Sequence, residues 1–100
     1  MYYKITQNDA IEFMASEDNW ILVDVRAPHE YAQGYIPEAV NIPLDTLPQG
    51  VAGLDPKKPV MVYCRSGVRS EKAAGILDRA GFETVLDIGG IQTWPGKIVR

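Results

Sequence analysis

Cysteine and histidine are scarce in this sequence: its 100 residues include one of each, Cys64 and His29. A single cysteine cannot form an intramolecular disulfide, so stability must come from packing, which suits a reducing compartment. A metal site built from clustered cysteine and histidine ligands is excluded as well, and we expect neither a metal nor a cofactor. A serine hydrolase would need His29, yet the sequence has no Gly-x-Ser-x-Gly motif.

Long apolar runs and a strong net charge are also lacking. No apolar run approaches the roughly 20 residues that a membrane-spanning helix needs. The first residues, "MYYKITQNDAIEF", lack the basic and apolar regions of a signal peptide. The formal net charge of -3 argues against nucleic acid as a partner. We expect a cytoplasmic protein that binds neither membrane nor nucleic acid, and we expect it to be a monomer.

The residues that are present suit a single small domain, residues 1-100. Hydrophobic residues make up 46% of the chain and charged residues 23%, which is enough apolar material for one core. We see no linker, internal repeat or low-complexity segment. The chain therefore reads as one domain, and its fold class rests on the order of its strands and helices.

Strands and helices are predicted to alternate along the chain. β-branched and apolar runs predict strands, and apolar positions at helical spacing predict helices. The predicted strands are 2–5, 20–26, 39–43, 59–64 and 83–89. Three helices are predicted. The first begins after Thr6 and the second spans 28–34. The third carries an apolar stripe and stops at Gly81; the stripe consists of Ala73, Ala74, Ile76, Leu77 and Ala80. This order predicts an α/β fold with a mostly parallel sheet and helices on both faces.

The one cysteine lies at the carboxyl end of a predicted central strand. Ligands of open α/β sheets bind at the carboxyl ends of strands, where Asp24 and Arg26 end the other strong strand. After Cys64 the chain continues as "RSGVRS" into the longest predicted helix. The alternative is that Cys64 is an inert, buried side chain, as free cysteine often is.

The residues after Cys64 favour a negatively charged sulfur. Unpaired N–H groups and the dipole at a helix N-terminus attract negative charge. Gly67 lets the backbone curl so that several amides point inward as an anion nest, and Arg65 and Arg69 add positive charge. We therefore predict that Cys64 is a thiolate nucleophile in a loop that also binds an anionic substrate.

Three segments, in this order, resemble the rhodanese family: "LVDVRAPHEYAQGYIPEAVNIP" (22–43), "VYCRSGVRS" (62–70) and "GGIQTW" (89–94). The resemblance implies a five-stranded parallel sheet flanked by helices and the transfer of a sulfane sulfur. Cys64 would attack thiosulfate or another persulfide donor, carry the sulfur as a persulfide and pass it to cyanide or a thiol. A thioredoxin-like dithiol protein is a chemically reasonable acceptor.

The resemblance assigns the substrate-binding role to the loop, mostly through its backbone amides. Its members after the nucleophile are Arg65, Ser66, Gly67, Val68 and Arg69. We expect Arg65 to recruit the anion at the entrance and Arg69 to brace the loop from behind. Ser66 and Ser70 also fit ordinary capping roles.

Supporting roles are expected for residues outside the loop. Asp24 is expected to pair with an arginine, and Arg26 and Glu30 are candidates for a pair across the first segment. Trp94 is expected to anchor the core. The segment departs from the family pattern at Tyr35, where a histidine is usual, and at Glu38-Ala39, which replaces a small Gly-Ala pair.

Two other functions compete with sulfur transfer. Cysteine phosphatases and arsenate reductases with related folds use a Cys-x5-Arg loop, whereas Cys64 and Arg69 are one residue closer together, which suits a smaller group. The other alternative is a non-catalytic binding module or a persulfide carrier. The complete cysteine loop argues against a binding module but does not separate a carrier from a thiosulfate-specific enzyme.

Overall fold

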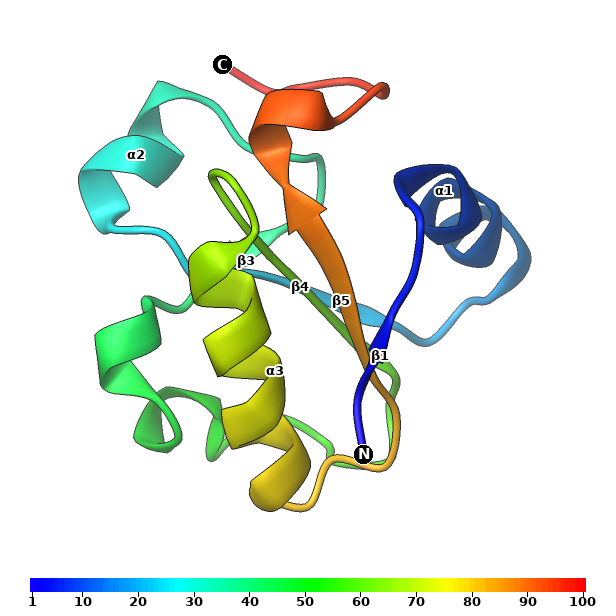
Figure 1. Ribbon diagram of the computed structural model, residues 1–100, viewed down its shortest axis with the longest axis vertical. Helices are drawn as coiled ribbons and strands as arrows, with labels where there is room; N and C mark the ends of the chain where they lie inside the picture. The colour runs from blue at the N-terminus through cyan, green and yellow to red at the C-terminus, as the bar shows by residue number, and fades with distance from the viewer.

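Five strands form one sheet in the order β1-β5-β4-β2-β3 in the computed structural model, which describes residues 1–100 (Figure 1). Every neighbouring pair is parallel. The strands are β1 (Tyr3–Lys4), β2 (Ile21–Asp24), β3 (Val40–Asn41), β4 (Val60–Cys64) and β5 (Val85–Gly90). The predicted α/β class and five-stranded sheet are confirmed, and the sheet is parallel throughout.

Helices cover both faces of the sheet, as predicted. They are α1 (Gln7–Ser16), α2 (Pro28–Gln33) and α3 (Val68–Arg79). Ala73, Ala74 and Leu77 of α3 pack with Val62 and Cys64 on one face, which we call the α3 face. On the opposite α1 face, the core contains Ala10 of α1 together with Leu22, Met61, Tyr63 and Ile88.

Strand β4 occupies the centre of the sheet, between β2 and β5. All five of its residues are buried, which explains why its sequence is a continuous apolar run rather than an alternating one. Successive side chains of a strand point to opposite faces, so the Cys64 side chain belongs to the α3 face and that of Tyr63 to the α1 face.

Local signals set the helix ends. The Thr6 hydroxyl accepts a hydrogen bond from the Asp9 amide at 3.0 Å and caps α1. Pro28 takes the first position of α2, and Gly81 adopts a positive φ of 99° beyond the end of α3. The predicted strand 20–26 is shorter in the structure because Asp24 turns its carboxylate to the Arg26 amide at 2.9 Å, which ends the extended backbone.

Three short 3-10 helices complete the chain: Leu44–Thr46, Gln49–Val51 and Ile91–Thr93. The last follows β5 directly, and the remaining C-terminal segment returns to pair Val99 with Tyr35. In Figure 1 this segment lies near α2 at the edge of the sheet where the strands end. Asp24, the last residue of β2, and Cys64, the last residue of β4, lie at this edge.

Candidate active site

Cys64 is the last residue of β4, and its side chain is buried with 1% of the residue exposed. The Gly67 amide donates a hydrogen bond to the Cys64 sulfur at 3.0 Å. Arg65 and Ser66 are exposed, so the chain leaves the core directly after the cysteine, as predicted. The sulfur therefore lies beneath a short loop that curls back over it.

Gly67 makes this loop geometry possible. Its φ is +105°, a left-handed conformation that residues with a side chain rarely adopt, and it forms the N-cap of α3. Its own carbonyl accepts a hydrogen bond from the Ser70 hydroxyl at 3.1 Å. The turn aims the start of α3 at the sulfur.

Most amides around the sulfur have no acceptor within the protein. Apart from Gly67, none of the amides from Arg65 to Ser70 donates a hydrogen bond to a protein atom. Free N–H groups at the start of a helix carry partial positive charge and bind anions. The loop can therefore accept several oxygen atoms, or a negatively charged sulfur, from a ligand that enters above Cys64.

Gly90 holds the loop from the neighbouring strand. A methyl group on Gly90 would lie 2.2 Å from the Arg65 carbonyl oxygen and 2.7 Å from the Ser66 Cα. The Gln92 amide donates to the same Arg65 oxygen at 3.2 Å. The start of the loop thus lies against the end of β5, at a distance that only glycine permits.

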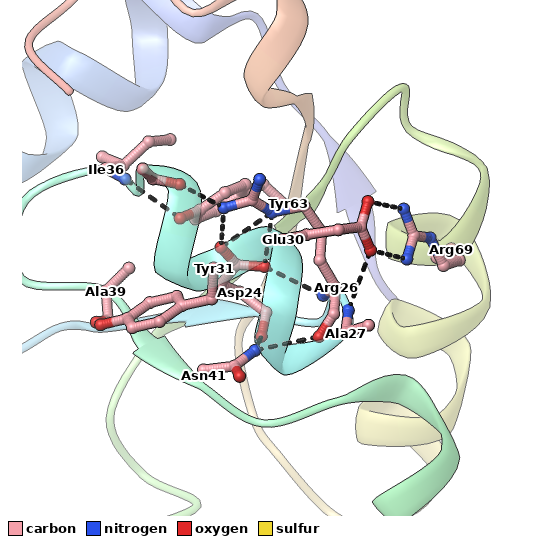
Figure 2. Close-up of polar contacts among 11 residues, drawn as sticks. Asp24, Arg26, Ala27, Glu30, Tyr31, Ile36, Ala39, Asn41, Tyr63 and Arg69 are labelled. Carbon is pink, nitrogen blue, oxygen red and sulfur yellow. Dashed lines mark hydrogen bonds and ion pairs between the residues drawn. The ribbon is translucent and has the colours of Figure 1, made fainter. Parts of the chain in front are cut away.

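The two loop arginines differ in their surroundings. The Arg69 guanidinium forms a bidentate ion pair with Glu30 of α2, through Nη1–Oε1 at 2.6 Å and Nη2–Oε2 at 3.0 Å (Figure 2). The hydrogen bonds from Arg69 lower the pKa of Glu30 to about 2. Arg65 forms no ion pair and is exposed.

Arg69 therefore ties α3 to α2, and its charge is balanced by Glu30. The bracing role predicted for it has a structural basis in this pair. Arg65 is the one loop cation whose charge is free to attract an anionic ligand.

Asp24 and Arg26 form a second, buried ion pair. Arg26 donates through Nε and Nη2 to the Asp24 carboxylate, with the shortest contact at 2.6 Å, and through Nη2 to the Gly34 carbonyl at 2.7 Å (Figure 2). The pairing suggested between Arg26 and Glu30 is wrong. Arg26 turns back to Asp24, two residues earlier, while Glu30 faces Arg69.

Further hydrogen bonds hold the segment 22–43 in place around the Asp24–Arg26 pair. Asn41 donates to the carbonyls of Asp24 and Arg26, both at 3.0 Å. The Tyr63 hydroxyl accepts from the Ile36 amide at 3.1 Å, and burial raises the pKa of Tyr63, which keeps the phenol neutral. These contacts place the turn after α2 against the residue that precedes the cysteine.

The family departures at Tyr35 and Glu38 alter this turn rather than the loop. Tyr35 stacks on Tyr31 with ring centroids 4.3 Å apart. Glu38 has a φ of +72°, where glycine would be unstrained, so Glu38 costs roughly 1 kcal/mol of backbone strain. Trp94, expected to anchor the core, is only partly buried and packs at the border of the α1 face.

Two hollows lie beside the loop. One, of about 350 Å³, lies next to Arg69 and is lined mainly by Val25, Ala27, Pro43 and Leu44. The other, of about 270 Å³, includes Ser66 and Gly67 from the loop. Either can admit a small acceptor to the neighbourhood of the loop.

No group of histidine, cysteine, aspartate or glutamate residues in the structure is arranged to hold a metal ion. None of the helices has the length and apolar character that crossing a membrane requires.

Two features of the site were missed by sequence reasoning. The Glu30–Arg69 pair joins residues 39 positions apart, and no local pattern indicates which carboxylate an arginine will meet. The close approach of Gly90 had a weak signal, because paired glycines after a strand are typical of places where two backbones come together.

Comparisons with known proteins agree with this geometry. The family model described as a rhodanese-like domain matches residues 6–97. A sulfurtransferase from Allochromatium vinosum is 36% identical over 95 residues, which cover 94% of this chain and 89% of the relative. A thiosulfate sulfurtransferase from Coxiella burnetii is 34% identical and covers 94% of this chain and 88% of the relative. A putative sulfur carrier protein from Bacillus subtilis is 34% identical over 82% of this chain, which spans 45% of that relative.

Solved structures show the same fold. A rhodanese-related protein from Thermoplasma volcanium superposes with a TM-score of 0.85 at 32% identity, with 98% of each chain covered. A structure described as rhodanese with anions, from E. coli, has a TM-score of 0.73 at 31% identity and covers 81% of this chain and 98% of its own.

The contact at Gly90 predicts the effect of adding one methyl group. Gly90→Ala must push the Arg65 carbonyl away, so we expect a loss of about 1–3 kcal/mol in the free energy of unfolding and faster alkylation of the Cys64 thiol. Gly53→Ala is the matched control, because a methyl group there meets no atom within 4 Å. Urea unfolding measures the loss of stability, and the rate of Cys64 alkylation measures the displacement of the loop. Equal stability and equal alkylation rates for the two variants would show that Gly90 does not constrain the loop.

The Glu30–Arg69 pair predicts a pH-dependent contribution to stability. The pKa of Glu30 is about 2 in the folded protein against 4.5 for a free carboxyl. The contribution is therefore complete above pH 4.5 and lost as the pH falls toward 2. We expect Glu30→Gln to lower the free energy of unfolding by about 1–2 kcal/mol at pH 6, less than the full shift implies because the Arg69 side chain is 35% exposed.

The measurement is urea unfolding of both proteins between pH 6 and pH 2.5. The difference between them should shrink as the pH falls. Glu12→Gln, an exposed position on α1 without an ion pair, is the control and should show no such trend. A difference for Glu30→Gln that stays constant or grows in acid would refute the role of the pair.

Proposed function

The chain belongs to the rhodanese-like domain family, and from this premise we propose that it transfers a sulfur atom from thiosulfate, or another persulfide donor, through a persulfide on Cys64. Relatives named as sulfurtransferases support a transferase role. The observation that carries the proposal is the set of free amides around the one cysteine sulfur of the chain.

In the first step, the Cys64 thiolate attacks the outer sulfur of thiosulfate. A new sulfur–sulfur bond forms on Cys64, the sulfur–sulfur bond of thiosulfate breaks, and sulfite leaves with its electron pair. No external oxidant or reductant is needed, because the outer sulfur passes from sulfite to the thiolate. The product on the protein is a Cys64 persulfide, which carries negative charge at its outer sulfur.

The loop fits both the donor and the intermediate. Thiosulfate is a dianion, and the amides of Ser66, Val68 and Arg69 have no protein acceptor to give up when it binds. The same amides can stabilise the outer sulfur of the persulfide, because donors fixed before the reaction stabilise charge without rearranging. Arg65 draws the anion toward the loop, and Arg69 keeps α3 in place through Glu30.

The names of two relatives favour an oxyanion donor. The Coxiella burnetii relative is named as a thiosulfate sulfurtransferase, and the E. coli structure is described as rhodanese with anions. We extend both properties to this chain as part of the proposal, with the loop from Arg65 to Arg69 as the substrate-binding residues and Asp24 and Arg26 as the supporting pair.

In the second step, an acceptor takes the outer sulfur from Cys64. Cyanide would leave as thiocyanate and restore the thiolate. A thiol would attack as in disulfide exchange, and a thioredoxin-like dithiol protein would release the sulfur as sulfide while it forms its own disulfide. The hollow beside Arg69 offers an apolar approach for such a group.

A persulfide carrier is the second candidate function. It is favoured by the name of the Bacillus subtilis relative, a putative sulfur carrier protein. A carrier would form the same Cys64 persulfide but would receive its sulfur from another persulfide rather than from thiosulfate. The donor, rather than the intermediate, separates the two functions.

Intact mass spectrometry tests the intermediate. The reduced protein exposed to thiosulfate should gain the mass of one sulfur atom at Cys64, and cyanide should remove it. Cys64→Ser should fold normally and gain no mass, because the hydroxyl is similar in size but a poor nucleophile. Sulfur transfer by the folded serine variant would refute the mechanism. Loading by a small-molecule persulfide but not by thiosulfate would favour the carrier.

Arg65→Ala tests recruitment of the donor. The thiosulfate concentration that gives half-maximal persulfide formation should rise about 5- to 20-fold, because one charged donor is lost. Discharge of the persulfide to an uncharged thiol should change by less than about twofold. Arg79→Ala, at the far end of α3, removes the same charge and should change neither quantity. An unchanged half-maximal concentration for Arg65→Ala would exclude the recruiting role.

A further inference from the structure

A separate cavity of about 220 Å³ lies between α2 and the C-terminal segment. Figure 1 shows these two segments near the edge of the sheet where the strands end. The residues that line the cavity are Arg26, Gln33, Gly34, Ile91, Ile98 and Arg100. None of them belongs to the loop from Cys64 to Arg69, and none carries a carboxylate side chain.

Arg26 presents an unused hydrogen-bond donor to this cavity. Its side chain is 93% buried, since only 7% is exposed. Nε and Nη2 are committed to Asp24 and to the Gly34 carbonyl, whereas Nη1 donates to no protein atom. In Figure 2 one terminal nitrogen of the Arg26 guanidinium has no dashed line. A guanidinium has five N–H donors, and the two on Nη1 remain available.

Two guanidinium groups line the cavity. Asp24 compensates Arg26, but Arg100 forms no ion pair. The Arg100 guanidinium lies close to Gly34, because a methyl group built on Gly34 would be 3.4 Å from its Nη1. The Gln33 side chain adds an amide at the rim. Guanidinium groups match the planar oxygens of carboxylates and related oxyanions.

We propose that this cavity binds a small oxyanion, either a carboxylate or a sulfur oxyanion, between Arg26 and Arg100. The buried pair with Asp24 orients the Arg26 guanidinium before the ligand arrives, so little conformational freedom is lost on binding. Arg100 supplies a second guanidinium, whose side chain forms no ion pair with a carboxylate of another residue.

This site is distinct from the place where sulfur chemistry is proposed. Arg26 packs over the Tyr63 ring, with its guanidinium carbon 5.8 Å from the ring centre, and Ile91 and Ile98 pack on the same α1 face. Cys64 belongs to the α3 face. An anion in the cavity therefore lies across the end of β4 from the sulfur, and the proposal does not depend on sulfur transfer.

Amide chemical shifts in nuclear magnetic resonance spectra of the reduced protein test the site. Sodium sulfate and sodium acetate are the two probes, each added at constant ionic strength against sodium chloride. We expect saturable shifts at the amides of Gln33, Gly34 and Ile91, with a dissociation constant of roughly 1 mM. Tighter binding of sulfate would identify a sulfur oxyanion as the preferred ligand, and tighter binding of acetate a carboxylate.

Variants distinguish specific binding in the cavity from nonspecific attraction of anions by positive charge. Arg100→Gln should raise the dissociation constant of the more tightly bound anion at least about fivefold. Gln33→Glu should abolish binding of that anion by placing a carboxylate at the rim of the cavity. Arg79→Gln removes one positive charge elsewhere and should have no effect. Arg26 is left intact because its loss would leave Asp24 buried without a partner.

Shifts confined to the amides of Ser66 and Gly67 would overturn the proposal, as would equal binding by Arg100→Gln and Arg79→Gln. Neither result affects the proposed persulfide, which is read from the mass at Cys64. Conversely, a chain that binds sulfate in the cavity but gains no sulfur at Cys64 would retain this site and lose the proposed function.

Discussion

The contact between Gly90 and the first residues of the cysteine loop is the constraint on which the site depends. It sets the end of β5 against the carbonyl of Arg65 and the Cα of Ser66, and the Gln7 side chain fastens the same stretch through the carbonyls of Ile88 and Gly90. With the start of the loop held there, the left-handed turn at Gly67 brings α3 over the sulfur. The free amides lie in the loop next to Cys64 because the ends of β4 and β5 and the start of α3 meet there.

Ion pairing distributes the positive charge at this edge of the sheet unevenly. Of the three arginines in the first segment and the cysteine loop, Arg26 is balanced by Asp24 and Arg69 by Glu30. These pairs fasten α2 to the sheet and to α3, and neither arginine is free to attract an anion to Cys64. The attraction for an anion at Cys64 therefore comes from unpaired amides and from Arg65. Fixed dipoles of this kind stabilise charge more effectively than mobile surface cations, which water and salt screen.

The sheet separates two groups of hydrogen-bond donors: those of the cysteine loop and the free nitrogen of Arg26. The loop donors face the sulfur on the α3 side, whereas the free nitrogen of Arg26 faces the cavity on the α1 side. Alternation of side chains along β4 produces this separation, because Tyr63 and Cys64 point to opposite faces. The burial of the whole strand keeps the register unique, since a shift by one residue would exchange the two faces.

The alternation of strands and helices, the position of Cys64 at a strand end and the family could all be predicted from the sequence, because periodicity and motif order are properties of local sequence. Strand ends were less predictable: the run from 20 to 26 stops at Asp24 because its side chain binds the Arg26 amide. Three features emerge only when the chain is folded: Glu30 meets Arg69 rather than Arg26, Gly90 lies against the loop, and a cavity opens beside Arg26. Each of these depends on segments far apart in the chain, and their distances are set by the packing of the whole core rather than by the residues next to them.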